Sequence, residues 1–208
     1  MKQGLFITFE GGDGAGKSTQ INLLADALRQ RGYEVVLTRE PGGTPIGEKI
    51  REIILDKENG EMADMTETML YAAARAQIVS ELIKPALAAG KIVICDRFVD
   101  SSIAYQAFGR NLGDCVWNIN QYAVDDCMPD LTILLKADPS VGSKRIDGRE
   151  QDRIELASSD FHQRVYEGYL ALELAYPERI KGIDATGTIE DIAKAIASEV
   201  FGRLEKQD

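Results

Sequence analysis

The sequence predicts an α/β fold in which one five-stranded parallel sheet is covered by helices on both faces. Five short apolar runs lie along the chain, and stretches with a helical spacing of apolar residues separate them. Strands that alternate with helices in this way form parallel sheets. The chain has 208 residues and no repeat, low-complexity segment or linker, so we expect a single domain over residues 1–208.

The predicted strands are apolar runs bounded by turn residues, and their continuous apolar character indicates burial on both faces of the sheet. They span residues 5–9, 34–38, 91–96, 131–135 and 180–184. Ligands of such sheets bind at the carboxyl ends of the strands. The residues at those ends are therefore the first candidates for function.

The predicted helices fill the intervals between the strands. The first ends at Gly32, and the second begins after Thr44 as its cap, with Pro45 in the first turn. A long helix over residues 65–89 is expected to kink at Pro85, which has no backbone N–H. Further helices are expected over residues 101–108, 114–126 and 158–176, from 139 into a charged stretch over 144–155, and from a capping box at 188–191 to about 204.

Composition and charge exclude several classes of protein. A net charge of −10 argues against a broad nucleic-acid or anionic-membrane surface, although local cations can still hold a nucleotide. Three irregularly spaced cysteines (Cys95, Cys115 and Cys127) and the single His162 predict neither a disulfide framework nor a zinc site. Cysteines that are reduced and packed suit a cytoplasmic protein, which we expect here without nucleic-acid or membrane partners. The sequence shows neither a signal peptide nor an apolar run long enough to span a bilayer.

A glycine-rich segment at residues 9–19 fits the phosphate-binding pattern G-x-x-x-x-G-K-[ST], with Gly11, Gly16, Lys17 and Ser18 at the fixed positions. Glycines allow successive backbone N–H groups to point at an anion. Lys17 supplies a cation for the terminal phosphates, and the Ser18 hydroxyl is a ligand of the kind that Mg²⁺ prefers. The segment lies between a predicted strand and a predicted helix, as a phosphate-binding loop (P-loop) requires.

Charged residues follow two more strands at the same edge of the sheet. Strand 34–38 leads to Arg39, and strand 91–96 ends at Asp96, followed by Arg97. Asp96 is placed to bind Mg²⁺ directly or through water, and two arginines facing a P-loop indicate a second phosphate site. The alternatives are a turn cap for Asp96 and a surface ion pair between Arg39 and Glu40.

Two other patterns leave alternatives open. Tyr71 and Arg75 share a helix face, which suits either a nucleobase or an ordinary amphipathic helix. Arg145, Arg149 and Arg153 follow at i, i+4 and i+8, so a helix would place them on one face that could close over phosphates. That face could equally be solvated, because acidic neighbours at Asp147, Glu150 and Asp152 can neutralise it.

Three classes of function remain open at this point. The first is a kinase that transfers phosphate from a nucleotide to an acceptor that already carries a phosphate. The second is another kinase of the same fold that acts on a different nucleoside or nucleotide. The third is a nucleotide-dependent switch or binding protein, although the chain lacks the Asn-Lys-x-Asp element of a GTPase. A switch would also need no second set of phosphate-binding arginines.

Six segments together resemble bacterial thymidylate kinases, and the resemblance runs in order from Leu5 to about Leu204. They are Phe-Glu-Gly-x-Asp-Gly-x-Gly-Lys-Ser-Thr (9–19), Thr-Arg-Glu-Pro-Gly-Gly-Thr (38–44), Asp-Arg-Phe with Ser-Ser-x-Ala-Tyr-Gln (96–106), Pro-Asp-Leu-Thr (129–132), Asp-Arg-Ile-Glu (152–155) and Ile-Asp-Ala-Thr (183–186). The resemblance implies an ATP-dependent nucleoside monophosphate kinase that converts dTMP to dTDP with Mg²⁺. It also implies the P-loop NTPase fold with strand order 2-3-1-4-5, a short lid at about 144–155, and a homodimer.

The resemblance also assigns roles by position. ATP would bind Gly11, Gly12, Asp13, Gly14, Ala15, Gly16, Lys17, Ser18, Thr19, Ala185 and Thr186, with Mg²⁺ at Ser18 and Asp96. The dTMP phosphate would bind Arg39 and Arg97, the sugar Asp13 and Tyr105, and the base Tyr71, Arg75, Ser102 and Gln106. The catalytic cations would be Lys17, Arg97, Arg149 and Arg153. Ala15 stands where some relatives carry a loop arginine, and the lid arginines would supply that charge. Phe98 replaces the family's Tyr or His.

Overall fold

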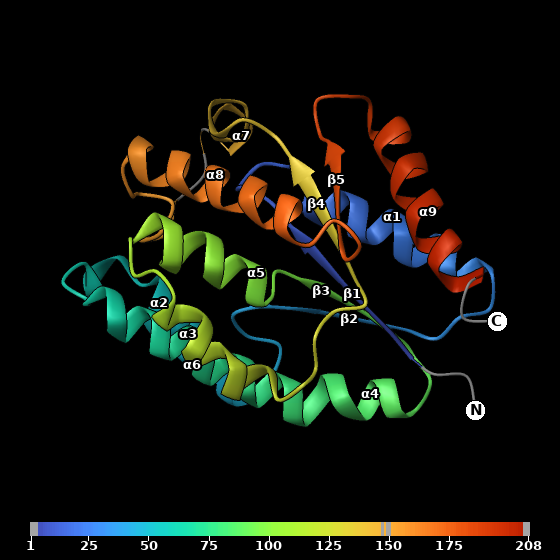
Figure 1. Cartoon of the computed structure of the whole chain (residues 1–208), viewed down its shortest axis with the longest axis horizontal. Coiled ribbons are helices and arrows are strands. Elements are labelled where there is room, and N and C mark those ends of the chain that lie inside the picture. Colours follow the sequence, from blue (N-terminus) through green and yellow to red (C-terminus); the bar gives the residue numbers. More distant parts are fainter. Residues whose placement is uncertain (1–3, 147, 149–150, 206–208) are drawn as a thin grey trace.

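The computed structural model describes residues 4–146, 148 and 151–205. These residues contain a five-stranded parallel sheet in the order β2-β3-β1-β4-β5, with helices on both faces (Figure 1). The strands are β1 (Leu5–Glu10), β2 (Val35–Arg39), β3 (Ile92–Asp96), β4 (Leu131–Lys136) and β5 (Ile180–Asp184). The predicted α/β class, the five strands and their order are confirmed.

One face of the sheet is covered by α1 (Lys17–Gln30) and α9 (Ile189–Glu205). Alternate residues of β1, such as Ile7 and Phe9, pack against Leu24 and Leu28 of α1 and Ile196 of α9. Because side chains alternate across a strand, the other residues of β1 face the opposite layer. The side chains of Phe6, Thr8 and Glu10 are all buried.

The opposite face is covered by the helices between β2 and β3 and by α5, α6 and α8, which follow β3. These helices are α2 (Pro45–Leu55), α3 (Asp64–Ile78), α4 (Lys84–Ala88), α5 (Val99–Ser102), α6 (Cys115–Val124) and α8 (Ser159–Ala175). Helix α7 (Pro139–Ile146) packs against α8. Short 3₁₀ and π segments lie at Lys57–Asn59, Val79–Ile83 and Ile103–Gly109. Two clusters of buried residues, one around Phe6 and one around Phe161, fill this layer.

Helix ends follow the predicted signals. The Thr44 hydroxyl accepts a hydrogen bond from the Gly47 backbone N–H at 3.0 Å, with Pro45 in the first turn of α2. The Thr188 hydroxyl likewise accepts from the Asp191 N–H at 3.1 Å before α9. The long helix predicted over residues 65–89 is interrupted by a π segment at Val79–Ile83, and Pro85 lies in the first turn of α4.

Two expectations differ from the structure. β2 is an edge strand that is only partly buried, whereas its apolar run predicted burial on both faces. Helix α7 ends at Ile146, and Gly148 takes a left-handed backbone with φ 89°. Arg145 and Arg153 therefore do not lie on one helical face, and Arg149 is outside the described residues. Among the described residues, no helix is both long enough and apolar enough to cross a bilayer.

Candidate active site

A cavity of about 500 Å³ lies at the carboxyl ends of β1, β2 and β3, where the sequence placed its candidates. One wall is the P-loop and the start of α1, and the opposite wall comes from α2, α3, α5 and the residues after them. Its lining includes Asp13, Gly14, Gly16, Lys17, Ser18, Thr19, Arg39, Tyr71, Asp96, Arg97, Ser102, Tyr105 and Gln106. Most of the predicted residues are thus brought together.

Lys17 is held inside the curve of the P-loop. Its Nζ donates hydrogen bonds to the carbonyl oxygens of Gly11 and Gly12, both at 3.0 Å. Gly16 precedes α1 with φ 95°, a conformation that costs glycine little. Burial and the nearby Arg97 cation lower the pKa of Lys17 to about 8. An anion bound in the loop would favour the charged ammonium.

Helix α7 packs directly against this loop. A Cβ on Gly142 would lie 2.2 Å from the carbonyl oxygen of Asp13, and a Cβ on Gly14 would lie 2.2 Å from that of Gly142. Arg145 of α7 donates to the carbonyl oxygens of Gly14 at 3.2 Å and Ala185 at 3.1 Å. Arg145 lines the cavity, whereas Ala185 and Thr186 lie outside its lining.

Asp13 and Arg97 join the two walls. One Asp13 oxygen accepts from Arg97 Nη2 at 2.7 Å, and the other accepts from the Tyr105 hydroxyl at 3.2 Å. Burial alone would raise the pKa of Asp13, but the charges of Arg97 and Lys17 outweigh it and lower that pKa to about 2. Asp13 is therefore ionised at neutral pH, and it directs the Arg97 guanidinium into the cavity.

Arg97 has a left-handed backbone, with φ 68°, which a non-glycine residue adopts only when its surroundings enforce it. Glu10 supplies part of this support, because its carboxylate accepts from the Phe98 N–H at 2.8 Å and the Ser101 hydroxyl at 2.6 Å. It also accepts from the Tyr169 hydroxyl at 2.9 Å. Burial and the neighbouring Asp100 carboxylate raise the pKa of Glu10 to about 7.

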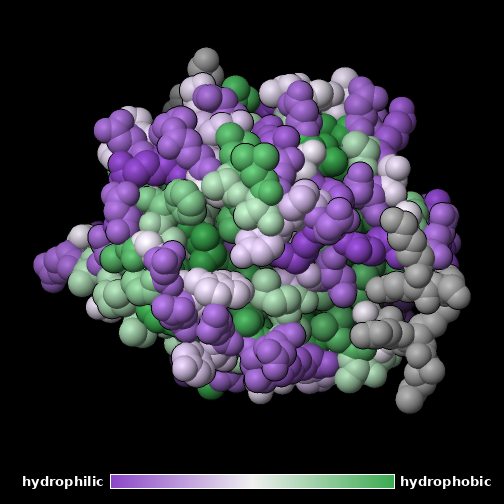
Figure 2. All heavy atoms as spheres, viewed as in Figure 1, coloured by the Kyte–Doolittle hydropathy of each residue, from purple (hydrophilic) through white to green (hydrophobic). Residues whose placement is uncertain are grey.

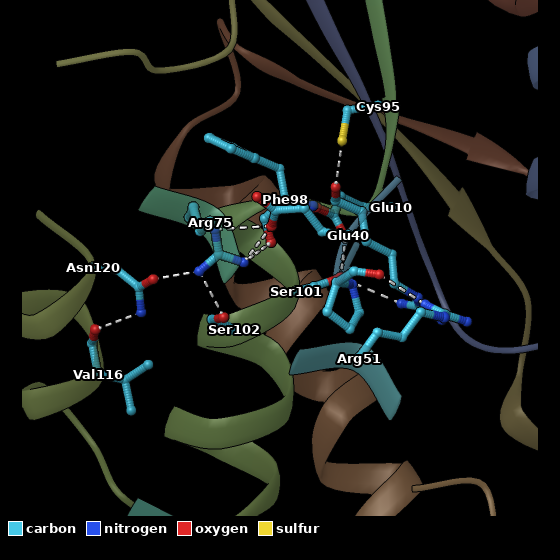
Figure 3. A network of polar contacts seen from close by, with 12 residues as sticks. Glu10, Glu40, Arg51, Arg75, Cys95, Phe98, Ser101, Ser102, Val116 and Asn120 are labelled. Atoms are coloured by element: carbon cyan, nitrogen blue, oxygen red, sulfur yellow. Dashed lines mark hydrogen bonds and ion pairs between the residues drawn. The ribbon is translucent and has the colours of Figure 1, made fainter. Parts of the chain in front are cut away.

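Arg75 lies behind the cavity wall, in a fully buried ion pair with Glu40 (Figure 3). Its Nε and Nη2 donate to one Glu40 oxygen at 2.9 and 2.6 Å, and its other N–H groups reach Ser102, Asn120 and the Phe98 carbonyl. All five of its N–H groups thus have protein acceptors. Arg75 is not itself a lining residue, and it reaches the cavity through its lining partners Glu40 and Ser102.

The Glu40 carboxylate itself belongs to the cavity lining, and its Oε1 has no hydrogen-bond partner among the described residues. Burial raises the pKa of Glu40 to about 7, against the opposing effect of Arg75. A buried acceptor without a donor is unusual in a folded protein. It marks this part of the wall as a place where a ligand or water can bind.

The wall opposite the P-loop also carries a cation that the sequence did not single out. Arg51 of α2 lines the cavity and donates to the Pro41 carbonyl at 3.0 Å. Arg39 is exposed and forms an ion pair with Glu48 at 2.9 Å, not with the adjacent Glu40. A signal for Arg51 existed, because α2 follows directly on the loop at the carboxyl end of β2.

Arg153 does not enter the cavity in this structure. Its Nε donates to the Ile54 carbonyl at 2.8 Å, and its Nη2 donates to Glu67 at 2.7 Å. Glu67 is fully buried and also binds Gln106 and Arg110. The prediction that Arg153 approaches phosphates from a mobile basic segment missed this long-range partner on α3.

The predicted metal ligands fit a magnesium ion. Ser18 and Asp96 both line the cavity, and the buried Asp96 Oδ1 has no hydrogen-bond partner among the described residues. An orphaned carboxylate oxygen and a serine hydroxyl that line one cavity are ligands of the kind that Mg²⁺ accepts. In the described part of the chain no group of three or more His, Cys, Asp or Glu side chains could hold a metal.

A second cavity of about 560 Å³ lies between α7 and α8 and shares Asp13, Tyr105 and Glu155 with the first. Its described lining residues include Asp138, Glu155 and Asp160 but no lysine or arginine. Phosphate groups need cations or backbone N–H groups. The first cavity, which Lys17, Arg39, Arg51, Arg97 and Arg145 line, is therefore the stronger candidate for a nucleotide site.

Comparison with known proteins gives one consistent result. The family model for thymidylate kinase matches residues 9–196. A thymidylate kinase from Exiguobacterium sibiricum is 51% identical over 207 residues, covering 99% of this chain and 98% of the relative. One from Geobacillus thermodenitrificans is 49% identical over 206 residues, covering 97% and 92%. The crystal structure of thymidylate kinase from Ehrlichia chaffeensis is similar, with a TM-score of 0.78, 33% identity, and coverage of 95% and 98%.

Proposed function

The chain belongs to the thymidylate kinase family, and from this premise we propose which residues carry out its reaction. As an ATP-dependent nucleoside monophosphate kinase, it phosphorylates dTMP to dTDP. One observation supports a common site for both nucleotides. A single cavity has a P-loop on one wall and Arg39, Arg51 and Arg97 on the other.

We assign the ATP side to the P-loop. Residues 11–19 surround the triphosphate with backbone N–H groups, and Lys17 neutralises the oxygens that gain charge during transfer. The adenine end lies toward Ala185 and Thr186, which Arg145 links to the loop. Ala15 contributes no cation, so positive charge on the transferred group has to come from other residues.

We assign the dTMP side to the opposite wall. Arg39 and Arg97 bind the acceptor phosphate, and Tyr71 packs against the base. Gln106 and Ser102 meet the edge of the base, where Arg75 contributes through Ser102. Asp13 accepts from the sugar 3′-hydroxyl, and Tyr105 occupies the space that a 2′-hydroxyl would need.

The reaction then depends on positioning and charge. The acceptor phosphate oxygen attacks the γ-phosphorus, and the bond to the β,γ-bridging oxygen breaks in line with it. Arg97 and Lys17 stabilise the transferred group from opposite walls. We keep Arg149 and Arg153 as lid cations, which requires Arg153 to leave Glu67. Arg145 of α7 already lines the cavity.

Ser18 and Asp96 would hold Mg²⁺. When bound, the ion supplies charge neutralisation to the β- and γ-phosphate oxygens. The free Oδ1 of Asp96 supports this assignment, because it is a buried acceptor with no other described partner.

We further propose a cytoplasmic homodimer. Exposed apolar side chains gather on α2, α3 and α6, which pack side by side, and Figure 2 shows hydrophobic surface in this region. They are Ile46, Ile53, Met65, Met69 and Tyr122. A patch of this kind on a single chain is typical of an interface. Sedimentation of wild type and Met69→Asp tests it, and a monomeric wild type would contradict the proposal.

The assignment of the two sides is tested with a panel of acceptors. Mg-ATP is incubated with dTMP, dUMP, dCMP, AMP, GMP and thymidine, and ADP release is followed. We expect turnover on dTMP well above the others. Preference for a nucleoside would indicate another kinase of this fold, and slow hydrolysis independent of acceptor would indicate a switch or binding protein.

A further inference from the structure

Glu67 of α3 binds side chains from three distant parts of the chain. Its Oε1 accepts from Gln106 Nε2 at 2.9 Å and Arg110 Nε at 3.3 Å. Its Oε2 accepts from Arg110 Nη2 at 2.9 Å and Arg153 Nη2 at 2.7 Å. The carboxylate is fully buried, so these contacts are shielded from water.

Glu67 is ionised at neutral pH. Burial alone would raise its pKa, but hydrogen bonds from Arg110, Gln106 and Arg153 outweigh burial and lower it. An ionised carboxylate accepts hydrogen bonds and donates none. The part of the Gln106 amide that faces Glu67 must therefore be its NH₂ group.

This pairing fixes the direction of the other half of the amide. With Nε2 bound to Glu67, the Gln106 Oε1 points elsewhere, and no described residue donates to it. Gln106 lines the cavity, and its Oε1 is not among the described oxygens that are both fully buried and without a partner. Gln106 therefore offers the cavity the acceptor Oε1, while its Nε2 is held by Glu67.

We propose that Glu67 is a positioning residue that sets base specificity, because it makes Gln106 present Oε1 to the N3–H of thymine. Cytosine carries a lone pair at N3 in place of a hydrogen, so two acceptors would face each other without water between them. Turning the amide to suit cytosine would place Oε1 against the Glu67 carboxylate. The site thus rejects cytosine by an unfavourable contact as well as by a missing hydrogen bond.

The inference rests on the proposed function, in which Gln106 meets the base. A specific role of Glu67 in base recognition can be distinguished from a general role in holding the fold together. Uracil has the same N3–H as thymine, so Glu67 should govern discrimination against dCMP and leave discrimination against dUMP alone. Loss of packing or stability would lower activity on all three nucleotides together.

The test measures kcat/KM for dTMP, dUMP and dCMP with wild type and Glu67→Gln at saturating Mg-ATP. A glutamine at position 67 can donate to Oε1, which frees the Gln106 amide to turn. We expect the dTMP/dCMP ratio to fall on the order of 10-fold or more, and the dTMP/dUMP ratio to change less than about 2-fold. Arg110→Gln is the matched control, because it removes a different partner of Glu67 and should leave both ratios unchanged.

An unchanged dTMP/dCMP ratio in folded Glu67→Gln overturns the inference. Gln106→Leu then shows whether the role of Glu67 or the placement of Gln106 at the base is wrong. If it lowers that ratio, only the role of Glu67 is wrong; if it does not, the placement of Gln106 at the base is wrong. A further test uses only the wild type, so no folding defect can affect it. Turnover of dTMP is compared with that of its N3-methyl derivative, and equal turnover would also overturn the proposal.

Discussion

Gly142 of α7 and Asp13 of the P-loop are in such close backbone contact that a Cβ on Gly142 would lie 2.2 Å from the Asp13 carbonyl oxygen. No side chain can relieve this contact, because the opposing atom is backbone. Gly142→Ala should therefore displace α7 or the loop and lower kcat/KM at least about 10-fold, since small displacements of positioning groups are costly. Steady-state kinetics with ATP and dTMP measure this.

The control for that substitution is Gly202→Ala in α9, where a Cβ meets nothing within 4 Å. It should keep wild-type kinetics and stabilise the fold by about 0.5–1 kcal/mol, because alanine loses less backbone entropy in a helix. Equal activity of Gly142→Ala and wild type would show that the loop does not depend on α7.

Lys17→Ala and Arg97→Ala should each lower kcat/KM on the order of 10²-fold or more, as expected for removing one preorganised charge from a transferring group. Their thermal unfolding shows whether the fold is retained. Lys194→Ala, which removes an exposed lysine of α9, is the control and should be neutral. Near-wild-type turnover in either site variant would refute its assigned role.

Mg-ATP binding should take up protons between about pH 8 and 9. Burial and Arg97 lower the pKa of Lys17 to about 8 in the free protein, and the triphosphate favours the charged form. Binding is therefore strongest below pH 8 and weakens as the pH rises through the pKa of free Lys17.

Calorimetry at pH 8.5 in two buffers of different ionisation enthalpy measures this uptake. The apparent binding enthalpy of the wild type should differ between the buffers. Lys17→Arg stays charged throughout, so its difference should be smaller. Identical enthalpies for the wild type in both buffers would contradict the lowered pKa.

Arg75→Met should destabilise the fold by about 3–5 kcal/mol, because it breaks a buried ion pair and leaves the acceptors on Glu40, Ser102, Asn120 and Phe98 without their donor. Urea unfolding measures the loss. Removing the exposed Arg29–Asp26 pair by Arg29→Met should cost less than about 0.5 kcal/mol. Similar losses in the two variants would mean that the buried network around Arg75 does not stabilise the fold.

The sequence predicted the parts of this site that depend on local patterns. The P-loop, Arg39, Asp96 and Arg97 could be placed because parallel strands end at one edge of the sheet. The confirmed strand order came from the resemblance to a family and not from spacing.

Partners that are distant in sequence could not be predicted in this way. The spacing of Arg75 suggested either a solvated side chain or a contact with a base, but its main partner Glu40 lies 35 residues away. Arg153 pairs with Glu67 across 86 residues. The shared face of Arg145, Arg149 and Arg153 required a helix beyond Ile146, and the left-handed Gly148 follows that residue.

The ion pair between Asp13 and Arg97 has a consequence for how the two substrates influence each other. Asp13 belongs to the loop assigned to ATP, and Arg97 to the wall assigned to dTMP. Whichever nucleotide arrives first alters the electrostatic environment that the second one meets. Thermodynamic reciprocity then requires that dTMP changes the affinity for ATP by the same factor as ATP changes the affinity for dTMP. The ATP and dTMP sites are in this sense two coupled binding sites joined through the Asp13 carboxylate.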